Sequence, residues 1–370
     1  MFSVLHIGKY YPPHQGGMES HLRDLAVRQT RVAQVNVVVA NAKRQNESCL
    51  MEGVRITRVA RIATIASMPI CPGLSTAIRR APADLVHVHM PNPGAALAFL
   101  RSGHIGRVII THHADTLGRQ FFRQFSDPFV VRLMRRASRI IVTSNRYLNS
   151  SLELMPFHDK CRVIPLGIDI HSPLDADPVA VSGLRRKFGD RLLLAVGRLV
   201  PYKGFDILIR SMKHIEGRLI LIGAGPQANA LASLAEAEGV QGKVSLLGQV
   251  EDLGPYFAAA SVFILPSINR AEAFGIVQLE AMAAGLPVVN TDIDSGAPEV
   301  SLDGITGLTV PPSDPISLAR AVSSLLDDRN LQLKMGEAGR KRVREEFSVE
   351  QMSARTMQIY DEIMEESVQQ

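Results

Sequence analysis

The hydrophobic positions of this chain follow two alternating patterns. Short runs rich in β-branched residues are typical of buried strands, and several are separated by stretches with helical spacing, such as residues 18–29 and 128–136. This alternation predicts parallel sheets wrapped by helices. The expected strands are FSVLHI, VNVVVA, VRITRV, LVHVH, RVIITH, RIIVTS and CRVIPL in the first half, and RLLLAVG, RLILIG, KVSLLG, SVFILP and LPVVNT in the second.

The alternation of predicted strands and helices is interrupted by one polar segment and then resumes. The stretch GIDIHSPLDADPVAVSG has no long apolar period and contains two prolines and two glycines, which is typical of a linker. A chain of 370 residues is long enough for two cores. We therefore predict an α/β protein with two open Rossmann-like domains in tandem: an N-terminal domain over 1–170, a linker over 171–189, and a C-terminal domain over 190–345 followed by a helical segment over 346–370.

Composition narrows the class of protein without identifying it. A hydrophobic fraction of 46% with 21% charged residues predicts a soluble globular protein, and no stretch approaches the roughly 18 apolar residues of a membrane span. Because the first residues show no pattern of a signal peptide, we expect a cytoplasmic protein. Three scattered cysteines do not form a disulfide framework or a zinc motif. A net charge of +5 does not indicate nucleic acid, but it suits a partner that carries phosphates.

Two loops that follow predicted strands have the composition of anion sites. In GKYYPPHQGGMESHL, Gly16 and Gly17 precede a helix that we expect to open at Met18, where free amides and glycines let a phosphate approach. In VGRLVPYKGFDILI, Arg198 and Lys203 are placed to clamp a diphosphate. Glycines needed only for a turn, and loop cations that are simply solvated, are the alternatives.

Histidines end two strands of the first half. His112, His113 and Asp115 follow RVIIT, whereas His87 and His89 alternate along LVHVH and therefore share a face. A histidine at such a strand end can bind a sugar hydroxyl or transfer a proton. Because no H-x-x-x-H spacing accompanies them, we expect no metal site. Turns are also the preferred interpretation of the two D-x-D triplets, at residues 175–177 and 292–294.

The segment EAFGIVQLEAM places two acids eight positions apart. Its apolar periodicity predicts a helix from near Gly275 to Gly285, so Glu272 precedes the helix and Glu280 lies inside it. The unsatisfied amides of a helix start favour an anion between them. Acids that only complement the helix dipole would account for Glu272 but poorly for Glu280. A nucleotide sugar, with hydroxyls on both sides of a diphosphate, accounts for both.

At this point the residues resemble a known family. EAFGIVQLE is similar to the E-x7-E motif of retaining glycosyltransferases of the GT-B fold, family 4. The resemblance extends over YPPHQGGMESH, THHAD, PLGID, VGRLVPYKG and EAMAAGLPVV, and therefore over nearly the whole chain. It implies two Rossmann-like domains that face each other across a cleft, with a final helix that packs back toward the first domain.

The resemblance also implies roles for residues at the matching positions. Glu280 is expected to hold the ribose and Glu272 the hydroxyls of the donor sugar. The first domain supplies a catalytic histidine, for which His113 matches better than its neighbour His112. The remaining donor-binding residues that it implies are Gly16 and Gly17, which close over the diphosphate, the amides of Phe274, Gly275 and Ile276, and Arg198 and Lys203, which neutralise the leaving group.

The implied reaction is transfer of a hexose from a nucleoside diphosphate sugar to a glycan or a lipid-linked acceptor, without a metal or other cofactor. The segment SINRAEAFGIVQLEAMA resembles that of mannosyltransferases that use GDP-mannose in surface-polysaccharide synthesis. A UDP-sugar is the alternative donor. The competing functions are a phosphorylase or an epimerase of the same fold, and a non-catalytic sensor of nucleotide sugars.

One segment suggests a membrane surface. GRQFFRQFSDPFVVRLMRRAS interleaves cations with phenylalanines, a composition that suits an anionic membrane at the inner face of the cell membrane. An ordinary amphipathic helix with solvated arginines is an equal alternative. The residues concerned are Arg119, Phe121, Phe122, Arg123, Phe125, Phe129, Arg132, Arg135 and Arg136.

Overall fold

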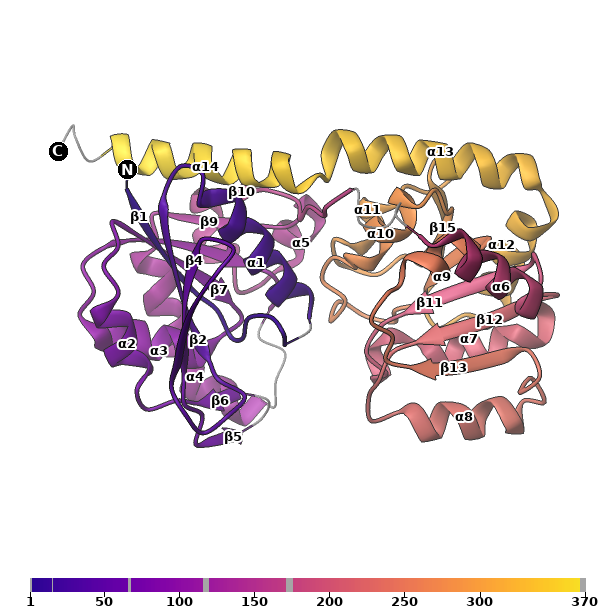
Figure 1. Cartoon of the computed structure of the whole chain (residues 1–370), viewed down its shortest axis with the longest axis horizontal. Coiled ribbons are helices and arrows are strands. Elements are labelled where there is room, and N and C mark those ends of the chain that lie inside the picture. The colour runs from indigo at the N-terminus through magenta and orange to yellow at the C-terminus, as the bar shows by residue number, and fades with distance from the viewer. Residues whose placement is uncertain (1, 15, 66–67, 116–119, 171–175, 367–370) are drawn as a thin grey trace. The chain divides into compact units, whose positions relative to one another are not determined.

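The structure is a computed structural model of the chain, and it describes residues 2–14, 16–65, 68–115, 120–170 and 176–366, without the side chains of 120–127 (Figure 1). The chain divides into two compact units. Unit 1 comprises Met1–Leu166 and Val349–Gln370, and unit 2 comprises Gly167–Ser348. The border therefore falls four residues before the predicted end of the first domain.

Part of the predicted linker is a helix. Residues 178–188 form α6 (Pro178–Phe188), which our linker assignment missed. The carboxylate of Asp177 accepts the amide of Val179 at the N-terminus of this helix, and Pro178 occupies its first position. Both are helix-start features, and they outweigh the polar composition that suggested a linker. Residues 171–175, with the first D-x-D aspartate, lie outside the described residues.

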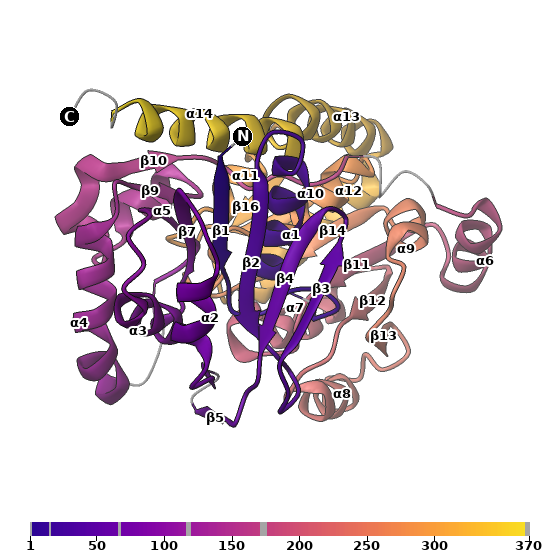
Figure 2. The same cartoon turned by 60° about the vertical axis from the view of Figure 1, so that its left-hand side comes forward.

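Unit 1 is built on a sheet that, over the described residues, has eight strands in the order β10-β9-β8-β7-β1-β2-β4-β3. All neighbours are parallel except β3, which runs antiparallel to β4. Figure 2 shows β7, β1, β2, β4 and β3 side by side. The strands are β1 (Ser3–Ile7), β2 (Gln34–Ala40), β3 (Glu47–Met51), β4 (Val54–Val59), β7 (Leu85–Met90), β8 (Arg107–His112), β9 (Arg139–Val142) and β10 (Cys161–Val163).

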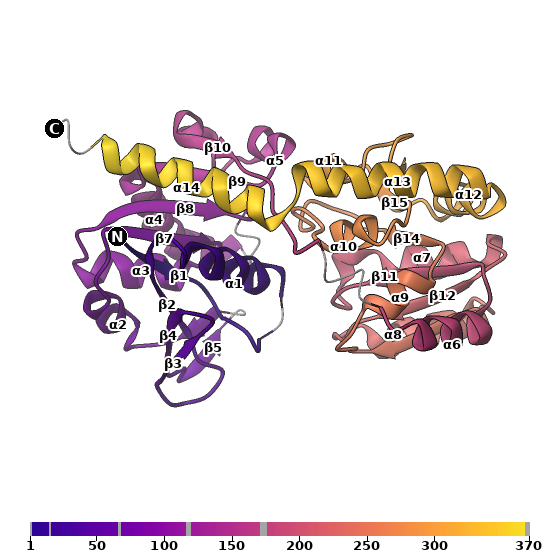
Figure 3. The same cartoon turned by 45° about the horizontal axis from the view of Figure 1, so that its top comes forward.

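Helices cover both faces of this sheet. Leu5 of β1 packs with residues of α2, α3 and α4, whereas Val4 packs with α1 and α14. Figure 3 shows α1 and α14 lying beside each other in unit 1, where their side chains are in contact. The central strands are thus buried on both faces, which agrees with their continuous apolar runs. The remaining elements are α1 (Gly17–Gln29), β5 (Ala63–Ile65), β6 (Met68–Ile70), α2 (Leu74–Arg80), α3 (Pro93–Ser102), α4 (Gln120–Arg136), α5 (Asn145–Ser150), η1 (Met155–Lys160) and α14 (Val349–Glu365).

Unit 2 contains a parallel sheet whose described strands follow the order β13-β12-β11-β14-β15-β16. The chain adds β12 and β13 on one side of β11, and then returns to place β14 on the other side. Such a reversal creates a crevice at the carboxyl ends of the two central strands. The strands are β11 (Leu192–Val196), β12 (Arg218–Ile222), β13 (Val244–Gly248), β14 (Val262–Leu265), β15 (Val288–Thr291) and β16 (Gly307–Val310).

The helices of unit 2 bury the apolar strands that the sequence predicted. One core joins Leu193 of β11 and Ile264 of β14 to side chains of α7, α8 and α12. Helix α13 packs against α10, the helix that follows the paired acids. The helices are α7 (Phe205–Ser211), α8 (Ala228–Ala237), α9 (Gly254–Ala259), α10 (Val277–Ala283), α11 (Ala297–Val300), α12 (Pro315–Asp327) and α13 (Arg329–Glu346), with short 3-10 turns η3 (Pro201–Lys203) and η4 (Met212–His214).

Candidate functional site

The predicted donor residues of unit 2 gather at the reversal of its sheet. Arg198 and Lys203 follow β11, whereas Glu272 and Glu280 follow β14, and these two strands are hydrogen-bonded neighbours. Both loops therefore leave the carboxyl edge of the sheet at the point where the strand order reverses. This is the position at which open α/β sheets bind ligands.

Lys203 and Glu272 form a buried ion pair between the two loops. The ammonium of Lys203 contacts Oε2 of Glu272, and the hydroxyl of Ser267 donates to the same oxygen at 2.9 Å. Lys203 is only 8% exposed and Glu272 only 7%. No other hydrogen bond or ion pair joins the Glu272 carboxylate to the described residues, which leaves its Oε1 for a ligand. The lysine is therefore not the open loop cation that the sequence suggested.

Close backbone packing brings the two loops together. The amide of Ile268 donates to the carbonyl of Tyr202 at 2.9 Å. Gly204 has a φ of +65°, and a Cβ there would collide with the carbonyl oxygen of Pro266. A glycine is thus required by both the backbone angle and the space. This approach is what places the Lys203 side chain against Glu272.

Helix α10 begins later than predicted. It runs from Val277 to Ala283 with Ile276 as its N-cap residue, whereas we expected it to start near Gly275. Gly275 has a φ of +72°, outside the helical region, which explains the difference. Glu280 consequently lies at the end of the first helical turn rather than beyond it, and it is half-buried. The amides of Phe274, Gly275 and Ile276 belong to the loop and the cap.

Two polar residues that the sequence analysis missed support this helix start. Gln278 is fully buried, and its amide nitrogen donates to the carbonyl of Ala297 at 3.2 Å. Its amide oxygen accepts Nδ2 of Asn290 at 3.0 Å, and Asn290 in turn accepts the hydroxyl of Thr309 at 2.7 Å. The sequence offered one indication of their role: each is a polar residue inside an otherwise apolar run, Gln278 in VQLEAM and Asn290 in PVVNT. The network links α10 to strands β15 and β16.

The other predicted cation of the loop has a different environment. Arg198 is exposed, and no ion pair joins it to another described residue. The structure therefore brings Lys203 and Glu272 together but leaves the Arg198 guanidinium open to solvent. Asp292 and Asp294 are also exposed, in tight backbone turns after β15, which agrees with their interpretation as turn residues.

The glycine loop of unit 1 ends one residue earlier than predicted. Gly17 is the first residue of α1 and Gly16 its N-cap, whereas we expected the helix to open at Met18. Both glycines are exposed. The buried carboxylate of Glu19 lies against Gly16, where a Cβ would meet it. The N-terminus of α1 is therefore already covered by an acid of its own first turn.

The two adjacent histidines after β8 have separate partners. Nδ1 of His112 lies 2.7 Å from the hydroxyl of Tyr147, which donates to Asp115 at 2.8 Å. Nε2 of His113 lies 3.4 Å from Nδ1 of His89. Burial lowers the pKa of His113 well below its usual value, and His21 and His112 lower it further, so the ring is neutral near pH 7. His113 therefore belongs to a group of buried histidines, whereas His112 belongs to a tyrosine–aspartate network.

The suggested membrane surface is only partly described. Arg119 and the side chains of Phe121, Phe122, Arg123 and Phe125 lie outside the described residues. Phe129, Arg132, Arg135 and Arg136 are exposed on α4, and the guanidinium of Arg136 lies 4.8 Å from the ring centre of Phe99. No described helix combines the length and the hydrophobicity that crossing a bilayer requires.

Comparisons with known proteins agree on one family. The model for "Glycosyl transferases group 1" matches residues 183–342, and that for "Glycosyltransferase Family 4" matches residues 15–172. The O-antigen chain mannosyltransferase C of Escherichia coli is 26% identical over 98% of this chain and 99% of its own length. A GDP-mannose-dependent alpha-(1-6)-phosphatidylinositol monomannoside mannosyltransferase of Mycolicibacterium smegmatis is 30% identical over 89% of this chain and 91% of its own.

Solved structures support the fold. The crystal structure of Anabaena Alr3699/HepE in complex with UDP-glucose has a TM-score of 0.81 to this chain at 21% identity, over 98% of this chain and 100% of that one. Such structural neighbours have the GT-B architecture of two Rossmann-like domains. This confirms the fold class that the motifs implied.

Proposed function

Because the chain belongs to the family 4, group 1 glycosyltransferases, we propose that it transfers a hexose from a nucleoside diphosphate sugar to a glycan or a lipid-linked acceptor, with retention of anomeric configuration. The observation that carries this proposal is the buried Lys203–Glu272 pair at the reversal of the unit 2 sheet. Burying two charges costs desolvation free energy that their attraction does not fully offset, so a buried ion pair at a ligand-binding edge is a candidate for a functional site. A carboxylate held there with one oxygen available suits the hydroxyls of a donor sugar.

The surrounding groups suit the rest of such a donor. In this proposal Glu280 accepts the ribose hydroxyls, and the amides of Phe274, Gly275 and Ile276 meet the diphosphate or the sugar. Arg198 supplies most of the positive charge for the leaving group, because it is exposed while Lys203 already faces a carboxylate. We propose that no divalent cation bridges the diphosphate, since the protein supplies these cations itself.

The proposed step forms a bond between the acceptor hydroxyl oxygen and the anomeric carbon. The bond from that carbon to the phosphate oxygen breaks, and its electron pair leaves with the nucleoside diphosphate, which also takes the acceptor proton. Attack from the side of the leaving group would retain configuration. In this step the His113 ring is neutral. Its Nε2 faces His89, so Nδ1 is the atom that can contact a sugar hydroxyl. The Gly16–Gly17 loop is proposed to cover the diphosphate.

Mannose carried by GDP is the favoured donor. The names of both mannosyltransferase relatives support mannose, and that of the Mycolicibacterium smegmatis relative also supports GDP. The UDP-glucose complex of the Anabaena protein supports the UDP alternative. Thermal unfolding with GDP, UDP, GDP-mannose and UDP-glucose separates the two. We expect the GDP-linked ligands to raise the midpoint and the UDP-linked ligands to leave it unchanged; the reverse pattern would contradict GDP-mannose.

A matched pair of variants tests the ribose assignment in the same assay. Glu280→Gln is expected to weaken binding of the nucleoside diphosphate about 10- to 100-fold, because hydrogen bonds to a charged group contribute about 1.5–3 kcal/mol. Glu236→Gln, on the exposed side of α8, is the control and should bind as the wild type does. Binding without any turnover would favour a sensor, whereas sugar phosphate formed from glycan and inorganic phosphate would favour a phosphorylase.

A further inference from the structure

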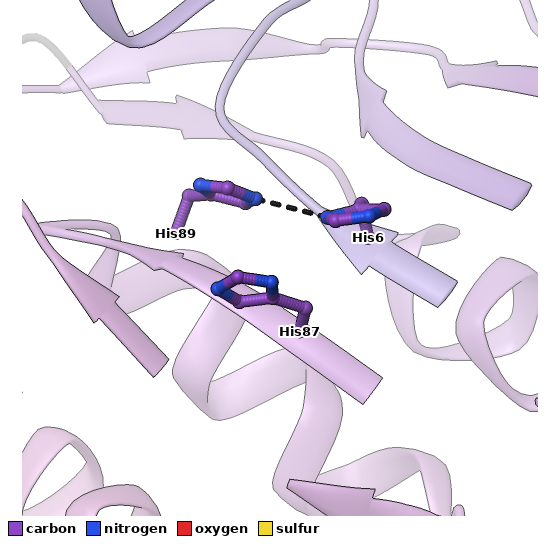
Figure 4. Close-up of side chains that lie close together, drawn as sticks. All are labelled: His6, His87 and His89. Atoms are coloured by element: carbon purple, nitrogen blue, oxygen red, sulfur yellow. Dashed lines mark hydrogen bonds between the residues drawn. The ribbon is translucent and has the colours of Figure 1, made fainter. Parts of the chain in front are cut away.

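Five buried histidines gather on one face of the unit 1 sheet. His6 of β1 pairs in register with His87 of β7, so the two side chains point to the same face. His89 lies two residues after His87 and shares that face, as Figure 4 shows. His21 comes from α1, which covers this face, and His113 follows β8. All five side chains are buried.

Two of these rings have both nitrogens occupied by protein groups. His87 lies 2.6 Å from the hydroxyl of Tyr360 and 2.6 Å from that of Thr111. His6 lies 2.7 Å from Oε1 of Gln29 and 3.1 Å from Nε2 of His89 (Figure 4). Both nitrogens of each of these two rings are thus hydrogen-bonded. They could bind another ligand only by giving up one of these contacts.

Of the other three rings, His89 and His113 turn one nitrogen toward each other, and His21 lies beside both. Neither nitrogen of His21 has a hydrogen-bond partner among the described residues, although its side chain is only 3% exposed. Its ring centre lies 4.9 Å from that of His113 and 5.5 Å from that of His89. One nitrogen from each of His21, His89 and His113 lies within 4.8 Å of the other two. A buried polar ring without partners requires an explanation such as an unseen ion or water.

The spacing of the facing nitrogens of His89 and His113 suits two ligands of one ion. Nδ1 of His89 and Nε2 of His113 are 3.4 Å apart, longer than the usual range of about 2.7–3.2 Å for a hydrogen bond that involves nitrogen. Two imidazole nitrogens bound about 2.05 Å from a tetrahedral zinc ion lie about 3.3 Å apart. We propose that His21, His89 and His113 form a binding site for one divalent transition-metal ion that prefers imidazole ligands, such as Zn²⁺.

The neighbouring groups fit the needs of such ligands. With Oε1 of Gln29 accepting from His6 Nε2, Nδ1 of His6 accepts from His89 Nε2, and the lone pair of His89 Nδ1 faces the site. A cavity of about 10 Å³, about the volume of one water, adjoins His89 and is also lined by Lys9 and Glu19.

No metal site was expected from the sequence, because the spacing of histidines within single segments does not match a metal motif. The three ligands come from α1, β7 and the end of β8, and only the register of the sheet and the packing of α1 bring them together. The site does not depend on the proposed transfer reaction. It is tested without any sugar donor.

The test is titration of the full chain, without a polyhistidine tag, with Zn²⁺ by calorimetry and with Co²⁺ by visible absorption. We expect one tight equivalent of Zn²⁺ and the intense visible bands of a tetrahedral Co²⁺ site, with no binding of Mg²⁺. His21→Phe keeps the ring volume but removes a ligand, and it should weaken Zn²⁺ binding more than tenfold. His214→Phe, which removes an exposed histidine of unit 2, should bind as the wild type does.

Several results would overturn the proposal. These are no tight equivalent in the wild type, weak bands of octahedral Co²⁺, unchanged binding in His21→Phe, or loss of binding in His214→Phe. If His21→Phe does not fold, as judged by circular dichroism, anomalous diffraction from wild-type crystals soaked in Zn²⁺ tests the position of the ion instead. An anomalous peak between His21, His89 and His113 supports the site, and a peak only elsewhere contradicts it.

Discussion

Removing the ammonium from the buried Lys203–Glu272 pair should destabilise the protein strongly. Breaking a buried ion pair by deleting one partner typically costs about 3–5 kcal/mol, because a charge is left uncompensated. Ser267 still donates to Glu272 at 2.9 Å, so we expect Lys203→Met to cost about 3 kcal/mol, at the lower end of that range. Lys203→Met combined with Glu272→Met leaves no buried charge and should recover most of the loss.

The measurement is urea unfolding followed by far-ultraviolet circular dichroism, because the chain contains no tryptophan to report by fluorescence. The exposed pair of Lys243 and Glu216 in the same unit is the control, with side-chain exposures of 34% and 84%. Glu216→Gln should cost about 0–1 kcal/mol. The reasoning would be refuted if Lys203→Met cost no more than this control. It would also be refuted if the two methionine substitutions were additive, since additivity means that the pair does not interact.

Three further changes probe the surroundings of the site and the pH dependence of unit 1. Gly204→Ala should lower the unfolding midpoint and weaken donor binding, because a Cβ there collides with the neighbouring loop, and unchanged binding would contradict the fit of the loops. Asn290→Leu should cost about 1–3 kcal/mol in urea unfolding, since it removes buried hydrogen bonds, and a smaller loss would remove the support proposed for α10. Hydrogen bonds from Ser3 lower the pKa of Asp84, so its stabilisation is fully present above about pH 3.8, the ordinary pKa of an aspartate, and is lost as the pH falls through the lower pKa of the folded state. Asp84→Asn should therefore be less stable than the wild type near neutral pH and equal to it in strong acid; an equal deficit at all pH values would contradict this.

Local sequence patterns were sufficient for much of the fold. The apolar β-branched runs predicted most central strands of both sheets, because strands buried on two faces are continuously hydrophobic. Short strands such as β5 and β6, of three residues each, lack enough length for a pattern and were missed. Helix α6 was missed because its start depends on one cap and one proline within a polar segment.

For the candidate site, sequence patterns predicted where its residues lie along the strands, loops and helices but not which of them are in contact. The spacing of Glu272 and Glu280 correctly placed the first acid in a loop and the second on a helix. The loops that carry Lys203 and Glu272 are separated along the chain by β12 and β13 but follow neighbouring strands of the sheet, so their pairing depends on the strand order, which no local pattern contains. For the same reason the sequence showed His87 and His89 on one face but did not show that His21 of α1 lies against that face.

Release of nucleoside diphosphate from a nucleotide sugar tests the central claim most directly. With GDP-mannose and a mannose-containing acceptor, the wild type and the control Glu236→Gln should both release GDP in step with sugar transfer. Glu272→Gln, which alters the carboxylate held by Lys203 and Ser267, should reduce that release at least 100-fold. Equal release by Glu272→Gln and the wild type would contradict the role assigned to this carboxylate. No release by the wild type from any GDP- or UDP-linked sugar, with any acceptor tested, would contradict the proposed donor class.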